Sequence, residues 1–298
     1  MDDKVKGGIE KIEAAAEKCN SFITGSFDKY LPALKAHGDV ILGAVERIAS
    51  RFSVLVMLVC GLLFTILCLK NMVFSFFFKD APANMCFSMA FGSLISLAIW
   101  SYAATKMLDA LAKVISSSNC KISSRNFFSV LTAIGLLETV TSFIGGIFLT
   151  CTFRSLLPLF YGLAATVLFA LITLYTANTE KFGIVEDATA SAGEDFVTIF
   201  TFLLKVMLRL VPVALLVISI IGIVQIVPMI FTTYINFGEK NNTFMTMRMV
   251  ADMTYAVRFV FIGIVPLAVY LVYIFNYVAL DIIRAILQLP NKLDELKK

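Results

Sequence analysis

The hydrophobic residues of this chain fall into long blocks, many of about 20 residues or more, separated by shorter polar stretches. A helix of that length crosses the ~30 Å hydrocarbon core of a bilayer at about 1.5 Å per residue. The blocks do not alternate residue by residue, as the strands of a membrane barrel would. Because a backbone in lipid must satisfy its own hydrogen bonds, the pattern predicts an all-α, polytopic bundle of transmembrane helices.

Six blocks are long enough to span a bilayer, and we expect three parts in the chain around them. The predicted spans are 53–76, 83–105, 127–151, 155–177, 210–234 and 256–279. They form a transmembrane domain over 53–279, which follows an amphipathic helical segment over 1–52 and precedes a helix extension and tail over 280–298. Only residues 152–154 separate the third span from the fourth, so these two should form a tight antiparallel hairpin.

The longest apolar run is Ser191–Phe237, in which Lys205 and Arg209 are the only charges after the first five residues. A helix over the whole run would be about 70 Å long, roughly twice the thickness of the hydrocarbon core. We therefore expect residues 191–209 to lie at the membrane surface or to protrude from it, with the crossing beginning near residue 210. A competing seven-span model makes 191–210 a span of its own, which requires a sharp turn after Arg209 and buries Lys205.

The helix of the last span is also expected to extend beyond the membrane, because its polar and apolar faces continue past the predicted membrane edge. Asp281 and Arg284 lie on the polar face of this extension, which we expect to end at Pro290. The extension and residues 191–209 should pack together outside the membrane. In that arrangement Asp281, or Glu194, would meet Lys205 or Arg209.

The first 52 residues predict two amphipathic helices. One face of the first carries small and apolar residues at helical spacing: Val5, Ile9, Ile12, Ala16 and Cys19. Gly25-Ser26 and Leu31-Pro32 should interrupt the helix, and Asp39 is a plausible N-cap for a second one. These helices suit docking of a partner protein. An interfacial membrane anchor is the alternative, but the mixed charge signs of the polar face disfavour it.

The distribution of basic residues predicts the orientation. With the N-terminus in the cytoplasm, 19 of the 25 Lys and Arg residues fall in cytoplasmic segments. Such an excess places both termini in the cytoplasm. The expected location is a bacterial inner membrane, with a eukaryotic endomembrane or plasma membrane as the alternative. In the latter case the Asn241-Asn242-Thr243 sequon of the predicted outer loop would become a glycosylation site.

A few polar side chains lie inside the predicted spans. Glu138 is the one acidic residue deep in a span, on a stripe with Ser142 that should face other helices. Gln225 and Asn276 are the other strongly polar groups. Because burying a carboxyl is costly, these four residues form the candidate intramembrane site, as a path for a proton or cation. The competing interpretation is structural, with the same groups forming hydrogen bonds between helices.

Composition argues against several functions. The chain has one histidine, six scattered cysteines and no CxxC pair, so no metal site, no cofactor and no enzymatic activity are expected. The net charge of +4 reflects membrane orientation, and no nucleic-acid partner is expected. Cys86 and Cys151 both fall near the outer ends of their spans and could pair, but two unpaired thiols are the preferred interpretation.

Two classes of function remain. The first is a structural or assembly component of the membrane that docks a protein partner, or copies of itself, through its cytoplasmic helices. The second is a small transporter or channel, for an ion-coupled or lipid-like substrate, that uses Glu138. Because polar residues in the spans are sparse, the sequence favours the first.

Overall fold

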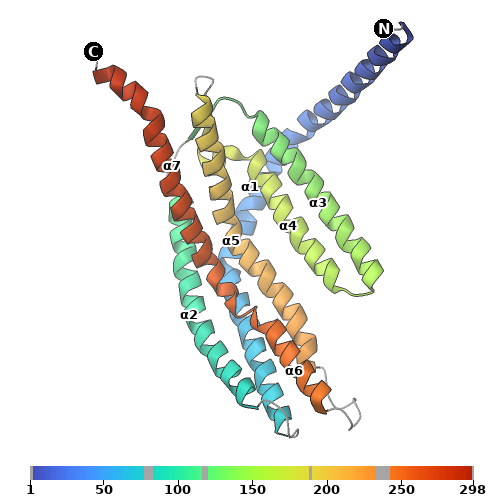
Figure 1. Cartoon of the computed structure of the whole chain (residues 1–298), viewed down its shortest axis with the longest axis vertical. Coiled ribbons are helices and arrows are strands. Elements are labelled where there is room, and N and C mark those ends of the chain that lie inside the picture. Colours follow the sequence, from blue (N-terminus) through green and yellow to red (C-terminus); the bar gives the residue numbers. More distant parts are fainter. Residues whose placement is uncertain (1–2, 77–82, 116–119, 188–189, 232–241, 297–298) are drawn as a thin grey trace.

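The computed structural model describes residues 3–76, 83–115, 120–187, 190–231 and 242–296, and these are nearly all helical (Figure 1). The α-helices are α1 (Asp3–Ser75), α2 (Ala83–Ile115), α3 (Asn126–Phe153), α4 (Leu157–Ala177), α5 (Ala192–Phe231), α6 (Asn242–Val257) and α7 (Val265–Leu296). The shorter elements are β1 (Cys120–Ile122), η1 (Thr179–Phe182), β2 (Ile184–Glu186) and η3 (Phe261–Ile264).

Six helical segments are long and apolar enough to cross a membrane. They are Lys35–Ser75, Ala83–Leu111, Asn126–Phe153, Leu157–Ala177, Ala192–Phe231 and Met249–Ile286. The prediction of a helical protein with six such segments is therefore confirmed. It follows that the exposed apolar side chains covering most of the bundle are suited to contact with lipid.

The chain termini lie at the same end of the bundle, which we call the terminal end (Figure 1). Helix α1 packs against α5 and α2, and α5 packs against α7. α1 and α5 run in the same direction, because Glu46 lies beside Arg209 near the terminal end and Lys70 beside Met229 near the far end. α3 packs mainly against α4, and these two helices form one flank of the molecule.

The predicted interruptions of the N-terminal segment are wrong. Gly25-Ser26, Leu31-Pro32 and Asp39 all lie inside α1, which is one helix of 73 residues. α7 likewise continues past Pro290 to Leu296. A proline removes one backbone hydrogen bond from a helix, and the turns on either side of it maintain the helical course here. The turn required by the seven-span model is also absent, because α5 is continuous through residues 209–212.

The last span differs from the prediction at its start. Residues 242–255, expected within the polar loop before this span, are part of α6, and the span is broken between α6 and α7 at residues 258–264. Pro266 lies in the first turn of α7, where its missing N–H breaks no helical hydrogen bond. Gly263 lies inside the break, and a Cβ placed on it would come within 2.5 Å of the Cβ of Trp100. The break therefore depends on close backbone approach to α2.

The all-α prediction also missed a small sheet at the terminal end. β1 and β2 pair in parallel, with Cys120 opposite Ile184 and Ile122 opposite Glu186. The hydroxyl of Thr198 on α5 donates to the carbonyl of Lys121 at 2.5 Å. The sheet thus connects the segment after α2, the segment after α4 and the start of α5.

The predicted hairpin of the third and fourth spans is confirmed. The turn places Arg154 in the left-handed conformation, with φ of 49°. The two helices make backbone contact at Gly146 and Gly162, where an added Cβ would lie 2.5–2.8 Å from the opposite Cα. Such close approach is possible only for glycine.

Candidate functional site

Arg209 is the centre of a polar cluster at the terminal end, which we call the terminal network: Glu46, Tyr175, Phe182, Lys205, Arg209 and Arg284. The Arg209 guanidinium donates to Oε1 of Glu46 on α1 at 3.2 Å and to the carbonyl of Lys181 at 3.3 Å. It also lies 4.4 Å from the ring centroid of Phe182. The hydroxyl of Tyr175 donates to the same Glu46 oxygen at 2.9 Å. One arginine therefore ties α5 to α1 and η1.

Lys205 lies one turn before Arg209 and is only 2% exposed. Its Nζ donates to the carbonyl of Phe182 at 2.9 Å. That carbonyl belongs to the last residue of η1, which is followed by Gly183 with φ of 72°, a conformation that favours glycine. A helix end supplies carbonyls that lack an intrahelical partner, and Lys205 satisfies one of them.

Arg284 joins α7 to the network. Its guanidinium donates to the Thr201 hydroxyl of α5 at 3.2 Å and lies 3.5 Å from both the Cys120 sulfur and a carboxylate oxygen of Asp281. α5 and α7 therefore pack together here, around the buried side chains of Leu204, Leu208, Tyr273 and Leu280.

The contacts seen among the described residues differ from the ion pairs predicted between these two extensions. Asp281 contacts Arg284 of its own helix, while Lys205 and Arg209 find partners on η1 and α1. Glu194 forms a reciprocal capping box, because it accepts from the backbone N–H of Ser191 at 2.8 Å and its own N–H donates to the Ser191 hydroxyl at 3.3 Å. α7 does pack against this part of α5, but η1 supplies the carbonyls that Lys205 and Arg209 contact.

More exposed ion pairs surround the terminal network. Glu180 contacts Lys35 at 2.8 Å and Arg125 at 3.1 Å, and Lys121 contacts Asp187 at 2.8 Å. Hydrogen bonds from Lys35 and then Arg125 lower the pKa of Glu180, and the bond to Asp187 raises the pKa of Lys121. Because these side chains are largely exposed, water and salt screen their interactions.

The four predicted intramembrane residues do not come together. Glu138 is exposed, so its expected orientation toward other helices is wrong. The line of α3 that touches α4 runs through Gly135 and Gly146, and Glu138 lies about 60° away from it around the helix. Ser142 lies half-buried near that line, while Asn276 donates to the carbonyl of Val272 in its own helix at 2.7 Å.

Gln225 is buried, and it belongs to a cluster that the sequence did not reveal. Its Nε2 donates to the Tyr161 hydroxyl of α4 at 2.7 Å, and its Oε1 accepts from Arg258 at 3.2 Å. We call Tyr161, Gln225 and Arg258 the far-end triad. Arg258 lies at the start of the predicted last span, 256–279, and its pairing with Gln225 was not predicted because the break after α6 could not be foreseen. An arginine next to the apolar run 259–275 was the signal available in the sequence.

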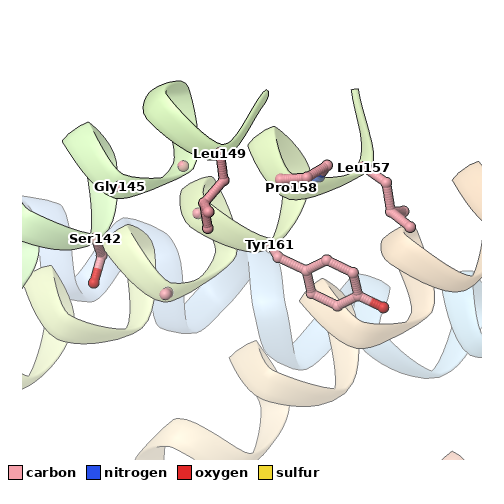
Figure 2. Close-up of a pocket in the computed structure, with 9 residues that line it drawn as sticks. Ser142, Gly145, Leu149, Leu157, Pro158 and Tyr161 are labelled. Atoms are coloured by element: carbon pink, nitrogen blue, oxygen red, sulfur yellow. The ribbon is translucent and has the colours of Figure 1, made fainter. Parts of the chain in front are cut away.

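A groove of about 470 Å³ lies beside the far-end triad, between α3 and α4 (Figure 2). Its wall is mostly small or apolar, and Tyr161 lies at one edge. Figure 2 shows the Tyr161 ring pointing away from Ser142 toward the neighbouring helix. Tyr161 therefore links the wall of the groove to Gln225.

Among the residues that the structure describes, no group of three or more His, Cys, Asp or Glu side chains could hold a metal ion. Cys86 is buried, Cys151 is exposed, and both are free thiols. No protein-family model, curated protein or solved structure matches this chain. Its six long apolar helices indicate a membrane protein, and its function is inferred below from geometry.

Proposed function

We propose that this chain is a structural or assembly component of a membrane, which holds a protein partner or further copies of itself at its terminal end. The terminal network carries this proposal. It joins α1, α5, α7, η1 and the small sheet to one another at the terminal end, which supports a partner-binding surface at that end.

The Lys and Arg distribution supports a cytoplasmic location for this surface, because 19 of the 25 basic residues lie in segments at that end. The protein would then lie in a bacterial inner membrane, or in the corresponding orientation in a eukaryotic membrane. The first part of α1 stands away from the rest of the bundle (Figure 1), and its amphipathic sequence pattern suits contact with a partner helix.

A transporter is the second candidate, and the broken last span favours it. Transporters place binding sites at interrupted helices, and here the interruption adjoins Gln225. Glu138 has no part in such a site, because it lies exposed on α3. A lipid-like substrate needs few polar groups and fits the far-end triad better than an ion does.

Site-specific photocrosslinking in native membranes tests the proposal. A photoreactive amino acid replaces Val40, which is 75% exposed on α1 at the terminal end, or Phe153, which is 67% exposed at the opposite end. We expect position 40 to give a protein adduct of constant mass and position 153 to give none. Equal labelling at both positions, or lipid adducts alone, would contradict an assembly role. Substrate flux into liposomes that contain the purified chain would favour the transporter.

A further inference from the structure

The groove between α3 and α4 has the dimensions of a site for a hydrocarbon chain. Its volume of about 470 Å³ falls within the range of small-molecule sites. Gly145, Gly146 and Gly162 leave its floor without side chains, while Leu149 and Leu157 form apolar walls. A Cβ on Gly145 would meet no atom within 4 Å, so this part of the groove is open.

Arg258 supplies a cation near the groove, because it donates to Gln225, which in turn donates to the groove residue Tyr161. Its guanidinium lies 3.5 Å from the Tyr255 ring centroid and donates to Gln225, which leaves further N–H donors. Within the described part of the chain, no carboxylate pairs with Arg258. Gln225, its hydrogen-bond partner, lies six residues before the end of α5, which is about 9 Å of helix. That depth suits contact with the headgroup region.

Tyr161 connects the two features. Its ring lines the groove, and its hydroxyl accepts from the Gln225 amide that also binds Arg258. Because this oxygen accepts from Gln225, its own proton remains available to a ligand. One donor, the Tyr161 hydroxyl, therefore belongs to the wall of the groove, and the second, the Arg258 guanidinium, lies on the other side of Gln225.

We propose that the groove binds an anionic amphiphile, a lipid whose phosphate contacts Arg258 and Tyr161 and whose acyl chain lies over Gly145. Arginine N–H groups bind phosphate through charge-assisted hydrogen bonds, and the missing side chains of the glycines make room for the chain. This site lies at the end opposite the terminal network, so it goes beyond the proposed assembly role and is tested independently of it.

Native mass spectrometry of the full-length protein, titrated with phosphatidylglycerol or phosphatidylcholine, tests the site. We expect a preference for phosphatidylglycerol, and Arg258→Gln should weaken its binding about tenfold by removing one charged contact. Arg154→Gln, at the exposed hairpin turn, is the control and should bind as the wild type does.

Gly145→Leu tests the groove without disturbing the fold, because its side chain enters open space. It should reduce binding of both lipids. Gly92→Leu is the matched control, since Gly92 also has nothing within 4 Å but lies on α2. Unchanged lipid binding in both Arg258→Gln and Gly145→Leu would overturn the proposal and indicate non-specific annular lipid only. Equal thermal midpoints of the variants exclude misfolding as the cause.

Discussion

At the terminal end, Arg209 connects α5 with α1 and η1 through polar bonds, whereas at the opposite end α3 and α4 touch through Gly146 and Gly162. The first arrangement needs free carbonyls and charged side chains, which helix ends and connecting segments provide. The second needs only small residues, and it operates inside an apolar slab. The two regions therefore respond to different changes in sequence and solvent.

The largest effect is expected at the glycine contact. Gly162→Leu places a Cβ 2.5 Å from the Gly146 Cα and 3.1 Å from the Ser142 carbonyl oxygen, and backbone atoms cannot rotate away. We expect a loss of about 3 kcal/mol in the free energy of unfolding, at the upper end for overpacking. Thermal unfolding in detergent measures it.

The control for this substitution is Gly145→Leu, seventeen positions earlier on the facing helix, where a Cβ meets nothing within 4 Å. Equal destabilisation by the two variants would show that helix propensity or insertion, and not the close contact, causes the loss.

The next largest effect is expected in the terminal network. Glu46→Ala removes the carboxylate that accepts from both Arg209 and Tyr175, and so leaves two partly buried donors without this acceptor. We expect a loss of about 2 kcal/mol, the usual cost of an unsatisfied buried group. Glu46→Gln keeps an acceptor oxygen and should lose less. Chemical unfolding monitored by circular dichroism distinguishes the two, and equal losses would argue against the shared acceptor.

A smaller effect should appear at acid pH. The pKa of folded Glu180 lies below its ordinary value of 4.5, because Lys35 and Arg125 favour the carboxylate. The pairs therefore stabilise the fold fully above about pH 4.5, and this contribution disappears as the pH falls through the lower folded pKa. Thermal midpoints measured from pH 7 to 3 should show a steeper decline for the wild type than for Glu180→Gln. High salt should reduce the difference, and parallel curves at low salt would contradict it.

Glu138→Gln should have the smallest effect on the fold. The Glu138 carboxylate makes no side-chain contact within the described residues, so the midpoint of thermal unfolding should stay within the error of the wild type. Thr132→Val is a useful comparison, since the buried Thr132 hydroxyl donates to Thr176 at 2.9 Å. A large loss of stability for Glu138→Gln would show that this side chain has a partner in the membrane.

The sequence was sufficient to predict those parts of the fold that depend on hydrophobicity alone. Six apolar blocks and the short 152–154 connection predicted six spans and the α3–α4 hairpin. It was not sufficient to predict which partner a polar side chain contacts. Lys205 and Arg209 were expected to meet α7, but η1 lies beside α5 and its carbonyls accept hydrogen bonds from both side chains. Proline was also a poor guide, because α1 and α7 continue through Pro32 and Pro290 while the real break precedes Pro266.

The candidate site shows the same division. Glu138 has the polarity of a buried functional group, but the glycines that determine the α3–α4 contact rotate it outward. Gln225 was identified from sequence, whereas its partners come from distant parts of the chain: Tyr161 from α4 and Arg258 from the break at 258–264. Side-chain chemistry can be listed from a sequence, but the direction of a helix face depends on its neighbours.

Because α1 is one unbroken helix, a movement of its outer end is transmitted along its whole length. Residues 3–34 alone form about 48 Å of helix at the start of α1, the part that stands away from the rest of the bundle (Figure 1). Because α1 is one continuous helix over this length, a tilt of about 6° at the membrane moves its tip by roughly 5 Å. A force on the tip is likewise transmitted to the contacts that α1 makes with α5 and α2. Whatever holds the outer end of α1 therefore acts directly on the centre of the bundle.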